Sequence, residues 1–101
     1  MFDIDILKST ITETLTALYD ENYPQVKVSV EDYLVKLEER LKIVAEAAAS
    51  GNIDTTFLGE RLKDELVLLE SELIALKVIG INVVQDAINK AIETALKIIT
   101  G

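Results

Sequence analysis

The side chains with the greatest potential for chemistry in this chain are its 18 carboxylates, because the sequence contains no histidine and no cysteine. Without these two residue types there is no thiol nucleophile, no Ser–His or Cys–His catalytic pair and no zinc site of the Cys/His type. A di-metal site in a helical bundle needs Glu-x-x-His, so that site is excluded as well. We therefore predict no cofactor and no enzymatic activity.

The densest group of carboxylates is formed by Glu60, Asp64 and Glu65, of which the first two are four residues apart. Such a group could hold a hard cation at a surface. Acidic residues near the start of a helix also interact favourably with the helix dipole, and we favour this structural interpretation. A glycosidase-like pair would need one acid buried to raise its pKa. We predict no catalytic and no metal-ligating residue.

Tyrosines and acids gather around the single proline, Pro24. Tyrosine offers a large contact area at a low entropy cost, so such a segment can form a recognition patch. The structural alternative is that the rings pin the linker over one end of the fold and keep their hydroxyl groups in water. The candidate secondary contact patch consists of Tyr19, Asp20, Glu21, Tyr23 and Tyr33.

Length and composition predict one domain that spans residues 1–101. The chain is 50% hydrophobic and 28% charged, which is typical of a globular protein and not of a disordered one. Its net charge of −8 opposes binding to nucleic acid and favours a basic protein partner. No stretch is apolar enough to span a membrane and no secretory leader is evident, so we expect a soluble protein in the cytoplasm.

Pro24 and the glycines divide the chain into four segments with helical periodicity. Asp3, Asp54 or Thr55, and Asn82 are candidate N-terminal caps, and Gly51 is a candidate C-terminal residue. We expect Gln25–Val28 to be extended, with Ser29 capping the second helix. The apolar positions of the four segments are Ile4, Leu7, Ile11, Leu15 and Leu18; Val30, Leu34, Leu37, Leu41, Val44 and Ala48; Leu62, Leu66, Leu69, Leu73 and Leu76; and Ile81, Val84, Ile88, Ile92, Ala95, Leu96 and Ile99.

This pattern predicts an all-α fold, an antiparallel four-helix bundle with up-down-up-down topology. Stop and start signals coincide at Gly80, which favours a turn there. The alternative is that the third and fourth helices merge into one long helix that is kinked at Gly80.

The third helix carries apolar residues on more than one side, which predicts more than one neighbour. The acidic surplus also avoids residues 81–101, which have no net charge. An apolar surface that is depleted of charge is typical of an interface core. The predicted partner interface consists of Val67, Ile74, Val78, Ile88, Ile92 and Ile99.

The resulting hypothesis is a non-enzymatic interaction or structural subunit. It would self-associate, most simply as a homo-oligomer, or dock into a larger assembly through apolar faces in residues 62–99. One alternative is an acidic inhibitor that neutralises a basic protein through the tyrosine segment. Another is a carrier of an apolar small molecule between the third and fourth helices, which requires a cavity of roughly 300 Å³ or more.

Overall fold

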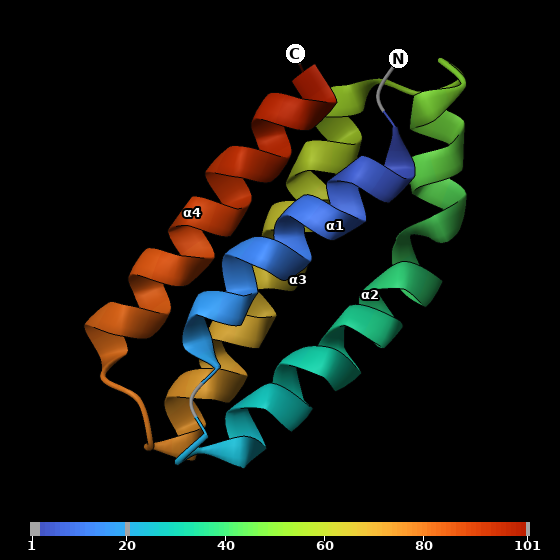
Figure 1. Ribbon diagram of the computed structural model, residues 1–101. Helices are drawn as coiled ribbons and strands as arrows, with labels where there is room; N and C mark the ends of the chain where they lie inside the picture. Colours follow the sequence, from blue (N-terminus) through green and yellow to red (C-terminus); the bar gives the residue numbers. More distant parts are fainter. Residues whose placement is uncertain (1–2, 20, 101) are drawn as a thin grey trace.

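The computed structural model describes residues 3–19 and 21–100, without the side chain of Ile4, and these residues form helices and no strand. The four helices run alternately down and up, which confirms the predicted antiparallel bundle (Figure 1). A short 3₁₀ helix, η1 (Thr16–Leu18), extends the first helix. The helices are α1 (Ile4–Leu15), α2 (Pro24–Ala49), α3 (Thr55–Leu76) and α4 (Ile81–Thr100).

Two of the predicted N-terminal caps are confirmed. The Asp3 carboxylate accepts a hydrogen bond from the backbone N–H of Asp5 at 2.8 Å, and Asp54 accepts one from the backbone N–H of Thr56 at 2.8 Å. Each bond satisfies a donor that the first turn of a helix leaves without a partner. Hydrogen bonds from the Thr56 backbone and side chain also lower the pKa of the Asp54 carboxyl group.

The predicted start of the second helix is wrong, because α2 begins at Pro24 and includes the stretch Gln25–Val28. Tyr23, the residue before the proline, is held outside the helical region at φ −131° and ψ 65°. Proline itself fits the first helical position, where a backbone N–H would have no partner inside the helix. Ser29 therefore lies inside the helix and is not its cap.

The other end of α2 follows the prediction. Gly51 adopts a left-handed conformation with φ 81°, which a glycine reaches without steric cost. The N–H of Gly51 donates to the carbonyl of Ala48 at 3.1 Å, and that of Asn52 donates to Ala47 at 2.8 Å. These bonds close the helix and begin the short connection to α3.

A turn separates α3 from α4, so the predicted break at Gly80 is confirmed and the single kinked helix is wrong. The residue that follows α3 and caps its C-terminus is Lys77, which has φ 58° and ψ 27°. The carbonyl of Gly80 then accepts hydrogen bonds from the N–H groups of Val83 and Val84, and α4 begins at Ile81. Asn82 therefore lies inside the helix and is not its cap.

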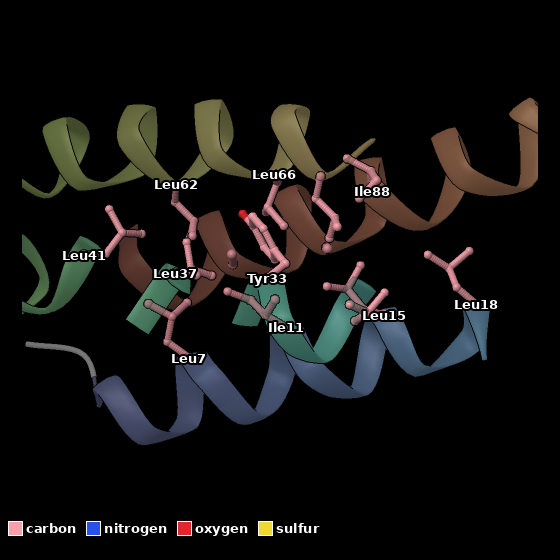
Figure 2. Packing of buried hydrophobic residues seen from close by; sticks show 14 of the residues in the cluster. Leu7, Ile11, Leu15, Leu18, Tyr33, Leu37, Leu41, Leu62, Leu66 and Ile88 are labelled. Atoms are coloured by element: carbon pink, nitrogen blue, oxygen red, sulfur yellow. The ribbon is translucent and has the colours of Figure 1, made fainter. Parts of the chain in front are cut away.

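The core runs the length of the bundle, and each helix contributes an apolar stripe to it. In Figure 2, the labelled side chains of α1 and η1 point toward residues of the other helices. The α1 stripe is confirmed at Leu7, Ile11, Leu15 and Leu18, and the α3 stripe at Leu62, Leu66, Leu69 and Leu73. Tyr33 is also buried in this core, although the sequence pattern did not include it.

The helices do not pack equally tightly around the core. The pairs α3–α4, α1–α4 and α2–α3 are in close contact, whereas α1 and α2 approach each other much less. Gly59 on α3 is one cause of the close α3–α4 packing, because a Cβ atom built there would lie 2.9 Å from Cδ2 of Leu96. The loose α1–α2 pair leaves a groove, which is described below.

Candidate functional site

The six residues of the predicted partner interface do not form one surface. Val67 is 44% exposed, whereas Ile74, Val78 and Ile92 are half-buried and pack against the core. Two further residues, Ile88 and Ile99, lie in the core itself. Except at the exposed Ile81, the apolar face of α4 packs against α1 and α3, so Ile88 and Ile99 offer no free surface in the single chain.

The predicted tyrosine patch is also divided by the fold. Tyr23 and Glu21 are exposed, Tyr19 is half-buried, and Asp20 lies outside the described residues. The ammonium group of Lys27 lies 5.9 Å from the centre of the Tyr19 ring, so this ring fixes the linker to α2. Burial, together with the negative charge of Glu31, raises the pKa of Tyr19.

Tyr33 does not belong to a contact patch, because it is buried between α2 and α3 and its hydroxyl oxygen points toward α3 (Figure 2). Among the described residues, its hydroxyl group is buried without a hydrogen-bond partner. Burial raises the pKa of this hydroxyl group far above its ordinary value, and the charge of Glu65 raises it further.

Glu65 is buried beside this tyrosine, and its carboxylate is paired with two arginines. The Arg40 guanidinium of α2 donates to Glu65 Oε2 at 2.9 Å, and Nη2 of Arg61 lies 4.0 Å from Oε1. The side chain of Glu65 is 8% exposed, whereas both arginines are about half exposed. The pair between Arg40 and Glu65 therefore joins α2 to α3.

The other two acids of this group of carboxylates, Glu60 and Asp64, are exposed. Within residues 3–19 and 21–100, no cluster of three or more acidic side chains is arranged to hold a metal ion. In the same part of the chain, no helix has both the length and the apolar character that a membrane crossing requires.

The start of α2 and the turn between α3 and α4 lie at the same end of the bundle (Figure 1). We call this surface the turn end and define it by Tyr19, Tyr23, Val78, Ile81 and Val83. Ile81 is 55% exposed and Val83 is 53% exposed, and the other three are exposed or half-buried. The turn end thus joins exposed members of the tyrosine segment to the apolar start of α4.

A groove of about 490 Å³ lies between α1 and the C-terminal half of α2, and the start of α3 contributes to its floor. We call it the α1–α2 groove. Its volume falls within the range of small-molecule sites. The carrier alternative required a cavity between the third and fourth helices, but α3 and α4 pack closely, and this groove lies between α1 and α2. The floor is apolar and consists of Leu7, Ile11, Leu37, Leu41, Ala45, Leu58 and Leu62.

The rim of the groove is charged, and acids outnumber bases on it. Nζ of Lys8 on α1 lies 2.9 Å from Oε1 of Glu38 on α2, and this ion pair links the two helices. The remaining charged residues of the rim are Asp3, Asp5, Lys42 and Glu46. The sequence analysis did not predict this groove. The apolar stripe of α1 can be recognised from its spacing, but the distance between α1 and α2 cannot.

Comparison with known proteins adds no family to this description. No protein-family model, no curated protein and no solved structure matches the chain. The function must therefore be inferred from the surfaces described above.

Proposed function

We propose that this chain is a non-enzymatic interaction protein that self-associates, or docks into a larger assembly, through the turn end. The observation that carries this proposal is that Ile81, Val83 and Tyr23 are all exposed and lie on segments at the same end of the bundle. Single exposed apolar residues are common on protein surfaces, whereas a group of aromatic and aliphatic residues at one place is typical of a binding surface. This surface replaces most of the interface that the sequence predicted.

The charge distribution supports this choice of surface. The chain has a net charge of −8, but residues 81–101 carry none of this surplus. Two copies of so acidic a chain repel each other, and contact through a neutral segment keeps that repulsion low. The core of an interface is also depleted of charge and enriched in tyrosine.

The chemistry of the side chains supports a non-enzymatic role. The sequence has neither histidine nor cysteine, the residue types that most often act as a general base or as an activated nucleophile near neutral pH. Glu65, the carboxylate that the described structure buries, is paired with Arg40.

Light scattering at increasing concentration tests the proposal. A self-associating chain gives a mass above 11.2 kDa, and Val83→Glu should return it to the mass of one chain. Burial of a new carboxylate in an apolar contact is costly, so we expect the dissociation constant to rise at least tenfold. Val35→Glu is the matched control, because Val35 is similarly exposed at 58% but lies along α2.

One result would remove half of this proposal, and another would contradict the choice of surface. A mass of 11.2 kDa at all concentrations excludes self-association and leaves only docking to a different protein. If Val35→Glu dissociates the complex and Val83→Glu does not, the interface lies on α2 and not at the turn end. Circular dichroism of both variants checks that the helices remain formed.

A further inference from the structure

The α1–α2 groove takes no part in the proposed self-association. It is formed by most of α1, by residues 34–49 of α2 and by the start of α3, and it lies toward the bundle end opposite to the turn end (Figure 1). Any role of the groove is therefore separate from that of the turn end. The loose packing of α1 against α2 requires an explanation of its own, because bundle helices usually pack closely along their length.

We propose that the α1–α2 groove binds a small apolar molecule that carries a positively charged head group, such as an alkylammonium ion. The size of the groove supports a small ligand. If each non-hydrogen atom of a ligand takes up about as much space as a liquid water molecule, about 30 Å³, then 490 Å³ holds roughly 16 such atoms.

The floor of the groove suits the apolar part of such a ligand. Its side chains are leucine, isoleucine and alanine, and they come from three helices. Each of them is at most 7% exposed, so the floor lies below the surface of the bundle. A hydrocarbon chain that enters the groove would exchange contact with water for contact with these side chains.

The rim selects the sign of the head group. Four acids and two bases line the groove, so its rim carries a net charge of −2. The whole chain carries −8, and its field adds to that of the rim. A cationic head group is therefore attracted, whereas the carboxylate of a fatty acid is repelled.

The ion pair between Lys8 and Glu38 does not block this ligand. Both side chains are about half exposed, and an ion pair of this kind contributes little to stability. A cationic head group can replace Lys8 as the partner of Glu38. Glu38 can therefore supply a carboxylate to the head group of a ligand that enters the groove.

The test uses three probes with the same ten-carbon chain: decyltrimethylammonium, decanol and decanoate. Binding is followed by nuclear magnetic resonance of the leucine and isoleucine methyl groups, below the micelle concentration of each probe. We expect decyltrimethylammonium to shift signals of Leu7, Ile11 and Leu41 and to bind at least tenfold more tightly than decanoate at low salt. The preference should shrink in 1 M salt.

Two pairs of variants separate the groove from general attraction to an acidic protein. Ala45→Leu fills the floor and should abolish binding of decyltrimethylammonium, whereas Ala75→Leu makes the same change at an exposed position of α3 and should not. Glu46→Lys removes a rim acid and should reduce the preference for the cation. Glu39→Lys makes the same charge change at an exposed α2 residue that is not part of the lining, and should reduce it less.

Each other outcome overturns the proposal. Equal binding of decanoate and decyltrimethylammonium shows that the rim does not select the head group. Binding that survives Ala45→Leu, or signal shifts confined to the turn end, shows that the groove is not the site. Light scattering that finds a complex dissociated by Ala45→Leu identifies a second copy of the chain as the occupant. None of these results depends on whether the turn end self-associates.

Discussion

Tyr33 and Glu65 place polar atoms in the apolar interior between α2 and α3, and only one of the two side chains has a hydrogen-bond partner there. The Glu65 carboxylate is satisfied by the Arg40 guanidinium at 2.9 Å. The Tyr33 hydroxyl group has no hydrogen-bond partner among the described residues. A buried polar group without a partner lowers stability, because it has given up its hydrogen bonds to water. Tyr33 is therefore the residue at which a single change should stabilise the bundle.

We predict that Tyr33→Phe raises the free energy of unfolding by about 1 kcal/mol, because it removes the unpartnered hydroxyl group and keeps the buried ring. Urea denaturation monitored by circular dichroism measures this change. Tyr23→Phe is the control: Tyr23 is exposed, and the free energy of unfolding should change by less than about 0.5 kcal/mol. A loss of stability in Tyr33→Phe would show that the hydroxyl group has a partner in solution.

The pH dependence of stability should also report on Tyr33. Burial raises the pKa of its hydroxyl group in the folded chain, whereas in the unfolded chain that pKa is near 10.0. The unfolded chain therefore loses this proton first, and the free energy of unfolding falls as the pH rises above about 10. In an absorbance titration at alkaline pH, we expect Tyr33 to ionise only when the helices unfold. The variant Tyr33→Phe should show a smaller decrease of stability over the same pH range.

At the scale of helices, a helix end could be predicted from sequence where it depends on an interaction between neighbouring residues. Asp3 and Asp54 cap their helices and Gly51 closes α2, because each acts on neighbouring backbone groups alone. The stripes of α1 and α3 were also predictable from their spacing. The start of α2 was predicted wrongly. Proline keeps the residue before it, Tyr23, out of the helical conformation, but it does not restrict Gln25–Val28, which follow it.

The candidate sites were harder to predict than the helices, because a sequence pattern does not show which helix covers which face. The burial of Ile88 and Ile99 depends on α1 and α3 flanking α4. Tyr33 is buried because the core-facing sector of α2 is wider than a heptad seam. The α1–α2 groove depends on the distance between two helices, and no motif encodes that distance.

Lys77 offers a test of how α3 ends. It adopts a left-handed conformation with φ 58°, which is unfavourable for a residue with a Cβ atom and is usually found for glycine. We predict that Lys77→Gly raises the free energy of unfolding by about 1 kcal/mol. Lys63→Gly makes the same substitution inside α3, where Lys63 is exposed, and should lower it by about 1 kcal/mol.

Urea denaturation of both variants measures this difference. Opposite signs for the same substitution would show that the backbone conformation decides the outcome, and not the loss of a positive charge. Destabilisation by Lys77→Gly would mean that α3 does not end at Lys77 in solution.

At the scale of the whole molecule, the bundle measures 43 × 22 × 19 Å, and its two candidate surfaces lie at opposite ends of the long axis (Figure 1). The turn end is apolar and includes part of a segment without net charge, whereas the rim of the α1–α2 groove carries a net charge of −2. The two surfaces therefore suit different partners. One suits another protein surface, and the other suits a small cationic molecule.

The separation of the two surfaces predicts that they act independently. Changes at sites that are more than about 10 Å apart and share no partner usually add in free energy. We therefore expect Val83→Glu to leave the affinity for decyltrimethylammonium unchanged within about twofold, and Ala45→Leu to leave the dissociation constant for self-association unchanged to the same extent. Titration of the probe into each variant and light scattering of each variant measure the two quantities. If decyltrimethylammonium promotes or disrupts self-association of the unmodified chain, the two ends are coupled through the packed core. The prediction that they act independently is then wrong.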